Sequence, residues 1–505
     1  MATANVAVAE KIVDAINALD ADALRAIASD DIEVVPLRAA LEWTTYRGKQ
    51  GVVRLMSDLA ETWTELHFEL EETREVTPGS VLGLATIRGR GHASAVPTEM
   101  PIGLVARIRD GLVVYAAVFT DRAEAERAAA SPPANVARMA DQISFARGAP
   151  SIDIVAVDDL KAAAQRAFEN DPAGSFSYGT SIGYPPLRAW IAEKHELLPE
   201  QVIVTNGSMQ ADAFLFELLV EPGDLVVVEA PTYDRTLLSL QNRGAEILAI
   251  PLEEDGIDVS ALASALKAGA RPRLAHIIPT FQNPAGYTLS LDKRRRLLEL
   301  ADQYDFLIFE DDPYIELRFE GERLPTMLSL DANDRVVYAS SFSKTVCPGI
   351  RVGYLAGPTE TIAGITKIAT ETYISPSMVS ESIVNEFCRS GAIDRSIETV
   401  KEALRERVQR LAAALERELP EAKFTAPDGG YFLWVDLPDA VDVDALFAAA
   451  EDRGVVFVKG TDFLLEGGQS SLRLAYSGVT PDEIDEGVRR LADAYRSLAP
   501  AAATT

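Results

Sequence analysis

The sequence predicts an α/β protein preceded by a smaller α+β unit, and three observations lead to this fold class. Downstream of about residue 141, short apolar runs alternate with helical stretches. These runs are residues 225–230, 274–279, 306–311 and 336–341. Continuous apolar runs separated by helices are typical of buried parallel strands. Upstream, helical patterns come first and strand-like alternation follows, which favours an α+β unit. Between the two regions, residues 123–140 are rich in small residues and hold a Pro-Pro pair, which marks a domain boundary.

We predict that the upstream region forms one domain over residues 1–127, followed by a linker over 128–140. Its helical patterns lie at about 5–28 and 49–65. The alternating segments that follow are residues 66–76, 80–92, 99–111 and 112–121. Helices followed by a curved antiparallel sheet make this domain α+β.

The downstream domain is predicted to run from 141 to 497, with residues 498–505 as a disordered tail. A long helical stretch at about 376–418 precedes shorter alternating segments near its end. We therefore expect a large central sheet and a small α/β subdomain formed by about 141–170 and 376–497.

Composition restricts the classes of function. The 505 residues are 48% hydrophobic and 25% charged, and no apolar run approaches the roughly 20 residues that cross a bilayer. The amino terminus carries acidic residues among its apolar ones, unlike a secretory signal. Because the net charge of −29 repels phosphate backbones and anionic lipids, neither nucleic acid nor a membrane is an expected partner. Two cysteines and four scattered histidines predict no disulfide framework and no metal site, which suits a cytoplasmic protein.

A lysine after a buried strand is the first candidate catalytic residue. Residues 340–354 read SSFSKTVCPGIRVGY, and Lys344 follows an apolar run. Desolvation and nearby positive charge favour the neutral form of such an amine, which can attack an aldehyde. Arg351 and the hydroxyls of Ser341 and Ser343 can hold a dianionic phosphate beside it. Taken alone, the segment is also compatible with a surface turn.

Other predicted strands end in complementary groups. Asp311, in FEDDPY, can pair with a pyridine nitrogen and keep it protonated. Asn283, in PTFQNPAG, and Tyr314 can each donate a hydrogen bond to a phenolic oxygen. Gly207 and Ser208 open a helix, whose N–H groups and dipole attract phosphate.

Tyr233 is a weaker candidate. It follows Pro231-Thr232 at a strand end and can stack on a pyridine face, although an isolated tyrosine at such a place is more often a packing residue.

In this order the motifs resemble those of the fold-type I pyridoxal-5′-phosphate (PLP) enzymes of aminotransferase class I/II. The motifs are N-G-S at 206–208, P-T-Y at 231–233, Q-N-P-A-G at 282–286, D-D-P-Y at 311–314 and S-F-S-K-T-V-C-P-G-I-R-V-G at 341–353. The resemblance covers about residues 141–497, and it is to the branch with 2-aminoadipate and kynurenine aminotransferases and the aminotransferase-like halves of MocR regulators. It implies PLP as cofactor and a large mixed, mostly parallel sheet with a small C-terminal α/β subdomain.

The resemblance also implies a role for each candidate. Lys344, Asp311 and Tyr233 would be catalytic, with Lys344 as Schiff-base lysine and proton shuttle. These three residues also bind the cofactor, and the other implied cofactor-binding positions are Gly207, Ser208, Met209, Asn283, Tyr314, Ser341, Ser343, Arg351 and Tyr178. Arg473, in SLRLAY, would grip the substrate α-carboxylate, with Asn283 and Tyr178 as further substrate contacts. Because Tyr178 matches a tyrosine that reaches the neighbouring subunit's phosphate, a homodimer is implied.

Two positions depart from the family pattern. Met209 and Ile182 stand where relatives usually have a glutamine and an acidic residue. The phosphate site can tolerate Met209, since its backbone N–H remains. A more apolar surrounding nevertheless leaves the substrate and the type of reaction open.

The upstream domain resembles the SnoaL-like branch of the NTF2-like cone fold, over about residues 5–127. The motif residues are 46–51, YRGKQG, with 107–113 and 119–125. Relatives use the enclosed pocket for acid/base catalysis, ligand binding or dimerisation. Candidate polar groups here are His67, His92 and Asp121, each of which is also explained as a surface or hydrogen-bonded structural residue.

Transamination of an α-amino acid is the first functional hypothesis. The second keeps the same site but diverts the substrate carbanion to β- or γ-replacement, C–C bond formation or annulation, or oxidation, for example on an S-adenosylmethionine-like or nucleotide-bearing substrate. The SnoaL-like domain favours this alternative, because its relatives are frequent in specialised metabolism. The third hypothesis is a non-catalytic PLP or ligand sensor, although the N-terminal region lacks a basic recognition helix. The N-terminal domain could also mediate assembly beyond the dimer.

Overall fold

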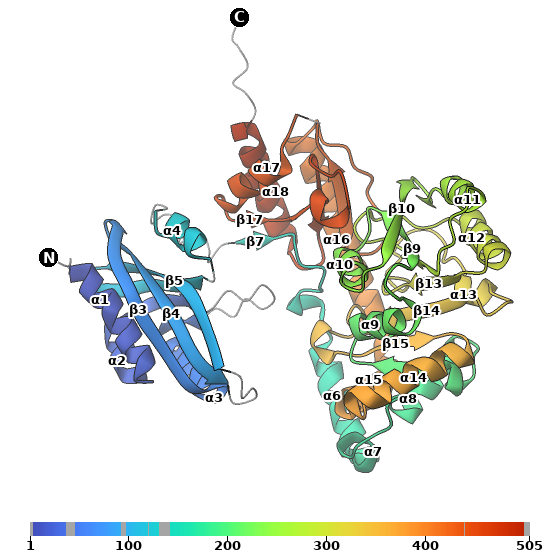
Figure 1. The fold of residues 1–505 in the computed structure, drawn as a ribbon, viewed down its shortest axis with the longest axis horizontal. Helices are drawn as coiled ribbons and strands as arrows, with labels where there is room; N and C mark the ends of the chain where they lie inside the picture. The colour runs from blue at the N-terminus through green and yellow to red at the C-terminus, as the bar shows by residue number, and fades with distance from the viewer. Residues whose placement is uncertain are drawn as a thin grey trace, which may run out of the picture. The chain divides into compact units, whose positions relative to one another are not determined.

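The computed structural model describes residues 4–36, 46–91, 97–119, 121–130, 142–438 and 440–498. The chain divides into two compact units, residues 1–141 and 142–505 (Figure 1). The candidate His92, residues 131–140 of the predicted linker and residues 499–505 of the predicted tail lie outside the described residues. Among the helices in the described ranges, none is long and apolar enough to cross a membrane.

The N-terminal unit is a six-stranded sheet with helices on both faces. Its strands are β1 (Ala28–Val35), β2 (Tyr46–Arg47), β3 (Trp63–Thr77), β4 (Ser80–Gly91), β5 (Pro97–Arg109) and β6 (Leu112–Phe119), in the order β2-β1-β6-β5-β4-β3. Its helices are α1 (Ala4–Asn17), α2 (Ala21–Ile27), α3 (Gly48–Thr62) and α4 (Arg122–Ala130). Strand β1 is parallel to β6, and the other neighbouring pairs are antiparallel. Apolar residues of α1, α2 and α3 bury one face of the sheet, while α4 packs on a separate cluster with Tyr115 and Phe119.

The prediction of one helix over 5–28 is wrong, because the chain turns after α1. Leu19 has a φ of 50°, and the Asp20 carboxylate accepts hydrogen bonds from the N–H groups of Asp22 and Ala23 at the start of α2. Asn17 then fastens the end of α1 to β3, since its side-chain amide both donates to and accepts from the backbone of Phe68. The strands β1 and β2 were also absent from the prediction.

The C-terminal unit is built around an eight-stranded mixed sheet. Its strands are β8 (Val202–Thr205), β9 (Leu225–Ala230), β10 (Glu246–Glu253), β11 (Gly256–Ile257), β12 (Leu274–Ile277), β13 (Leu307–Asp311), β14 (Val336–Ser341) and β15 (Gly353–Ala356). They lie in the order β11-β10-β9-β12-β13-β14-β15-β8. Within this order, the adjacent strands β10, β9, β12, β13 and β14 are parallel to one another. The predicted mixed, mostly parallel sheet is confirmed.

Helices cover both faces of this sheet, because successive strand residues point to opposite sides. Along β14, Val337 and Ala339 pack with α9 (Ser208–Leu219), α10 (Asp234–Asn242) and α14 (Thr359–Tyr373). On the other face, Val336 packs with α11 (Val259–Lys267), α12 (Leu291–Tyr304) and the short α13 (Met327–Leu330). On that face too, Tyr338 joins a cluster with α6 (Val157–Asn170), α8 (Pro185–Lys194) and α15 (Met378–Arg389). The five-residue α7 (Pro172–Phe176) follows α6.

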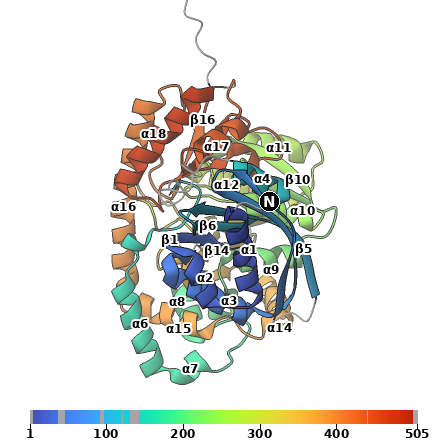
Figure 2. The ribbon, with the colours of Figure 1, turned by 90° about the vertical axis from the view of Figure 1, so that its left-hand side faces the viewer.

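A second core lies at the C-terminal end of this unit. It includes α16 (Ala392–Glu418), α17 (Val443–Glu451), α18 (Pro481–Leu498), the sheet of β16 (Phe432–Asp436), β19 (Ser471–Ala475) and β18 (Val458–Lys459), and the pair β17 (Val455–Val456) with β7 (Ile143–Ser144). Helices α16 and α18 run side by side (Figure 2). The predicted helical region 376–418 is two helices, α15 and α16, separated at Gly391, which has a φ of 72°.

Candidate active site

The predicted site residues converge on one edge of the eight-stranded sheet. Parallel strands end at a common edge, and in such sheets ligands bind beyond the carboxyl ends of the strands. Strand β13 ends at Asp311, and Lys344 follows the end of β14. Strand β8 runs in the same direction, because it is antiparallel to β15, which is antiparallel to β14. Ser208 therefore begins α9 at that same edge.

The Lys344 side chain is half-buried, and its amine lies next to aromatic rings. Its Nζ donates a 2.6 Å hydrogen bond to the Gly148 carbonyl and lies 5.2 Å from the centre of the Tyr431 ring. Burial, with the positive charges of Arg473 and Arg351, lowers the pKa of Lys344 to about 8. A substantial share of the amine is therefore neutral near physiological pH, as a nucleophile or a base requires.

Asp311 ends β13 with an unused oxygen. Its Oδ1 is buried and accepts no hydrogen bond from the described residues, while Oδ2 lies 3.6 Å from Nε2 of His276 on β12. An unpaired buried carboxylate oxygen is costly, so a missing donor is expected at this position. The protonated nitrogen of a pyridine ring is such a donor.

Two residues near Asp311 were not predicted as part of the site. His276 is fully buried beside it, and neither of its ring nitrogens has a hydrogen-bond partner among the described residues. Asp212 on α9 is buried as well, and its Oδ1 has no hydrogen-bond partner in the part of the chain that the structure describes. Burial and the charge of Asp311 raise the pKa of Asp212 well above its ordinary value. In the sequence, the one feature that marks these two residues is that Asp212 is a polar residue within an apolar helix and His276 one within an apolar strand.

Arg473 and Asn283 form a pair that joins the two cores of this unit. Arg473 Nη1 on β19 donates to Asn283 Oδ1 at 2.8 Å, and Nη2 donates to the Ala146 carbonyl at 2.6 Å. Its guanidinium lies 4.3 Å from the centre of the Phe432 ring and 4.9 Å from that of Phe463. Since the Asn283 oxygen faces Arg473, the amide N–H₂ of Asn283 remains a donor on its other side.

Tyr314 is a second buried donor near the lysine. The centre of its ring lies 5.7 Å from Lys344 Nζ. Burial raises the pKa of Tyr314 well above its ordinary value, so its phenol keeps its proton. It fits the predicted role of hydrogen-bond donor to a phenolic oxygen.

A cradle for an anion surrounds the start of α9. Gly207 has a φ of 88°, and a Cβ there would lie only 2.3 Å from Arg351 Nη2. Arg351 Nη2 also donates to the Asn206 carbonyl at 3.3 Å. The guanidinium therefore lies directly against the backbone that precedes Ser208, at the positive end of the helix dipole.

Ser341 and Ser343 are connected to each other at the end of β14. The Ser343 N–H donates to Ser341 Oγ at 3.1 Å, and Ser341 Oγ donates to the Val352 carbonyl at 3.4 Å. Both serines are buried, and Val352 precedes the first residue of β15. Along the chain both serines come just before Lys344, and Arg351 follows seven residues after that lysine.

Tyr233 and Met209 are neighbours, while Tyr178 is separate from them. The Tyr233 hydroxyl lies 3.6 Å from Met209 Sδ, so the residue that replaces the usual glutamine contacts the predicted stacking tyrosine. Tyr178 is 88% exposed. Within the described chain it does not reach the site.

Buried polar groups hold the loop that carries Asn283, and sequence analysis missed them. Glu229, in β9, accepts hydrogen bonds from Gln282 Nε2 at 3.1 Å, from the Ile278 N–H at 3.2 Å and from the Tyr287 hydroxyl. Arg294, which is 1% exposed, donates to the Pro279 carbonyl at 3.0 Å. These contacts depend on long-range folding, and no local pattern signals them.

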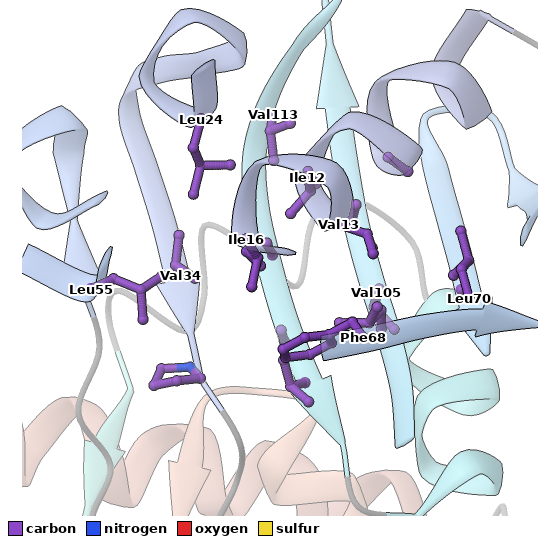
Figure 3. A pocket seen from close by; sticks show the side chains of 18 of the residues that line it. Ile12, Val13, Ile16, Leu24, Val34, Leu55, Phe68, Leu70, Val105 and Val113 are labelled. Atoms are coloured by element: carbon purple, nitrogen blue, oxygen red, sulfur yellow. The ribbon is translucent and has the colours of Figure 1, made fainter. Parts of the chain in front are cut away.

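The two N-terminal candidates that lie within the described residues are on the surface. His67 and Asp121 are both exposed, and neither lines the internal cavity of that unit, which apolar side chains such as Val13 and Phe68 surround (Figure 3). In the N-terminal unit, residues 128–130 of the predicted linker are the last residues of α4.

Comparisons with known proteins show to which family the chain belongs. Residues 140–491 match the family model for aminotransferase class I and II, and residues 9–116 match that for the SnoaL-like domain. An aromatic-amino-acid aminotransferase from Thermococcus litoralis is 34% identical over 70% of this chain and 88% of its own. A 2-aminoadipate transaminase from Thermus thermophilus is 35% identical over 70% and 90%. A solved structure of a Thermus thermophilus alpha-aminoadipate aminotransferase with N-(5′-phosphopyridoxyl)-L-leucine has a TM-score of 0.68 and 33% identity, over 72% of this chain and 95% of its own.

The chain belongs to the aminotransferase class I and II family, and it is a PLP-dependent transferase. The predicted fold type, cofactor and family are confirmed, as is the SnoaL-like domain that precedes them. The site residues fit PLP by three features of this structure. These are the unpaired Asp311 oxygen, the half-buried Lys344 amine and the glycine-lined cradle at Arg351.

Proposed function

We propose that the C-terminal unit transaminates an α-amino acid, with Lys344 as the residue that attaches the cofactor and moves the substrate proton. The single observation that carries this proposal is the half-buried Lys344 amine, at the same sheet edge as the unpaired Asp311 oxygen and the Asn283–Arg473 pair. When bound, PLP supplies an aldehyde that condenses with amines and a ring that accepts the electron pair released at the substrate Cα.

Each residue then has a task that its surroundings support. The neutral Lys344 amine takes the proton from the substrate Cα as a general base and then, as a general acid, delivers it to the carbon that was the cofactor's aldehyde carbon. Asp311 stabilises the protonated pyridine nitrogen, while Asn283 and Tyr314 donate hydrogen bonds to the phenolic oxygen. Tyr233 stacks on the ring.

Charged and hydroxyl side chains bind two anionic groups, the phosphate of the cofactor and the carboxylate of the substrate. Ser208, Ser341, Ser343 and the N-terminal N–H groups of α9, including that of Met209, bind the phosphate with Arg351. Arg473 binds the substrate carboxylate through its planar guanidinium. Its position between Phe432 and Phe463 supports this role, because the rings fix the guanidinium and keep water away.

We also propose that the enzyme works as a homodimer, to which Tyr178 contributes across the interface. Tyr178 is 88% exposed, and other large apolar side chains of the same unit are exposed too. They are Ile152, Phe176 and Ile374. Gly179, the residue after Tyr178, lies directly against Met378, because a Cβ at Gly179 would be only 2.3 Å from Met378 Sδ. Met378 follows Ile374 by four residues, so Tyr178 lies near the segment that carries Ile374. Exposed apolar side chains of this kind support an interface.

The test is a stoichiometric half-reaction. The full-length protein, loaded with PLP, is mixed with a panel of α-amino acids that begins with aromatic amino acids and 2-aminoadipate, the substrates in the relatives' names. We expect one equivalent of 2-oxo acid and one of pyridoxamine phosphate for each protomer. Lys344→Ala should abolish this turnover, whereas Lys267→Ala, an exposed lysine on α11, should retain it.

Two outcomes would contradict transamination. Exchange of the substrate α-proton without any oxo acid, or with a product of β- or γ-replacement, C–C bond formation or oxidation, would favour the diverted chemistry. Tight binding of PLP with neither proton exchange nor product, over the whole panel, would favour a sensor.

A further inference from the structure

Two carboxylates lie beside Arg473, the residue proposed to bind the substrate carboxylate. Asp234 is the first residue of α10, and Asp462 precedes Phe463 in a short 3₁₀ helix. The two segments are joined, because the Thr232 N–H donates a 3.0 Å hydrogen bond to the Phe463 carbonyl. The centre of the Phe463 ring in turn lies 4.9 Å from the Arg473 guanidinium. Both acids therefore belong to the wall of the active site next to this arginine.

Arg473 has a donor to spare and is influenced by both acids. Its side chain is 6% exposed, and its Nε has no hydrogen-bond partner among the residues that the structure describes. A buried donor without an acceptor is costly, so a further acceptor is expected here. Burial lowers the pKa of Arg473 to about 10, while neighbouring negative groups, with Asp234 and Asp462 among them, act to raise it.

The two acids are poorly neutralised by other side chains. Asp462 is exposed and forms no ion pair with any residue in the described ranges. Lys459, from the same segment, pairs with Asp444 at 2.5 Å instead. Asp234 lies 3.6 Å from the guanidinium of its neighbour Arg235, but a partly exposed pair of this kind contributes little.

The acids also repel each other. Partial desolvation raises the pKa of Asp462, Lys459 lowers it, and the charge of Asp234 raises it again. When a substrate carboxylate binds Arg473, it uses the positive charge that had attracted both acids. The site then carries an excess of negative charge, which a second positive group on the substrate would balance.

We propose that Asp234 and Asp462 select α-amino acids with a positively charged side chain, such as one that ends in an ammonium or a guanidinium group. This inference rests on the proposed transamination, because it names the substrate class of that same site. The substrate carboxylate binds Arg473, and the two acids attract the cationic end of the side chain. The same acids repel an acidic side chain, such as that of the 2-aminoadipate in one relative's name.

The test measures binding to the full-length protein loaded with PLP. Three acids without an α-amine are compared by titration calorimetry. They are δ-guanidinovalerate, heptanoate and adipate, which end in a cation, a methyl group and a carboxylate. We expect δ-guanidinovalerate to bind roughly tenfold more tightly than heptanoate, and adipate to bind most weakly. Adipate that binds as tightly as δ-guanidinovalerate would overturn the proposal.

Substitutions that remove charge locate the preference. Asp234→Asn and Asp462→Asn, made singly and together, change the charge but hardly the volume. The double variant should bind δ-guanidinovalerate roughly tenfold more weakly and heptanoate unchanged, which general damage to the site would not produce. The single variants carry the test if the double variant does not fold. Asp292→Asn is the control, because the side chain of Asp292 on α12 is 97% exposed. Variants that keep the full preference for the cation would contradict the assignment.

The half-reaction separates this inference from the proposed function. Lysine, ornithine and arginine join the panel of amino acids, and we expect them to yield 2-oxo acid faster than 2-aminoadipate does. If 2-aminoadipate or aromatic amino acids react and the basic ones do not, transamination stands and this inference fails. If no amino acid yields an oxo acid while δ-guanidinovalerate keeps its advantage, transamination fails and the selection of a cationic side chain stands.

Discussion

At the scale of single residues, burial controls the charges of the site. Lys344 loses its charge readily because burial removes water from its ammonium group and because Arg473 and Arg351 repel its positive charge. Arg473 keeps its charge, although burial lowers its pKa to about 10. The site therefore combines a neutral amine with a charged guanidinium. An enzyme needs both groups if it must attack a carbonyl and bind a carboxylate.

The pKa of Lys344 predicts the pH dependence of cofactor capture. Only the neutral amine reacts with the aldehyde, so the initial rate of PLP uptake by the cofactor-free protein should rise as pH increases through about 8 and then level off. Arg473→Gln removes a positive charge and should move the midpoint to a higher pH. Stopped-flow absorbance gives the rate, and a midpoint that Arg473→Gln leaves in place would contradict the electrostatic explanation.

Asp212 predicts an effect on stability. Its folded pKa lies well above the ordinary value of 3.8, so above that pH the folded chain keeps a proton that the unfolded chain has lost. The free energy of unfolding therefore falls as pH rises, until the folded carboxyl ionises too. Asp212→Leu removes both the unpaired oxygen and the titrating carboxyl that lowers the free energy of unfolding. The substitution should therefore stabilise the C-terminal unit by about 1–2 kcal/mol at neutral pH.

Urea unfolding at two pH values checks this prediction. The stabilisation by Asp212→Leu should be smaller at about pH 4 than at neutral pH, where the penalty is larger. Asp212→Asn is the control, because it removes the charge but keeps a polar group in the same place. A destabilised Asp212→Leu protein would mean that the carboxyl makes a favourable contact.

At the scale of elements, the site depends on how loops leave the strands. The turn at Gly207 allows α9 to begin directly against Arg351, and Glu229 and Arg294 hold the loop that presents Asn283. The strands supply fixed ends, and these side chains set the positions of the loops between them.

Gly207→Ala tests the cradle, and Gly223→Ala is a matched control. The two glycines have φ angles of 88° and 89°, so both lie in a region that disfavours a residue with a Cβ. Only at Gly207 does the new Cβ meet Arg351, since nothing lies within 4 Å of a Cβ at Gly223. We expect Gly207→Ala alone to weaken PLP binding, by roughly tenfold, as measured by equilibrium dialysis.

At the scale of the whole molecule, one chain combines a PLP-dependent transferase with a SnoaL-like domain. The polar chemistry lies in the C-terminal unit, while the cavity of the N-terminal unit is apolar. His67 and Asp121, the described candidates for N-terminal acid/base chemistry, do not line that cavity.

Mixed dimers test the proposed assembly. Co-expression of Lys344→Ala with Tyr178→Ala should restore about a quarter of the unaltered activity, because half of the dimers are mixed and each mixed dimer has one intact site. Lys344→Ala with Asp311→Ala should restore none, since both residues serve the site of their own subunit. Mixed dimers without activity above that of the parents would contradict a contribution of Tyr178 across the interface.

The sequence by itself determined the fold class, the family and the cofactor, because these depend on local patterns. Apolar runs mark the strands. Motifs such as S-F-S-K-T at 341–345 are recognised from neighbouring residues alone, without knowledge of the tertiary structure. The roles of individual site residues stay predictions, although the structure brings Lys344, Asp311, Asn283 and Arg473 to one region of the C-terminal unit.

Only the tertiary structure decided which distant groups meet. The pairing of Asn283 with Arg473 spans 190 residues, and His276 and Asp212 reach Asp311 from a different strand and a helix. The end of α1 is held to β3 by the contact of Asn17 with Phe68, and the apolar cavity depends on how the helices fit the sheet. Neither is encoded in a periodic pattern, because burial and partner choice arise from long-range packing.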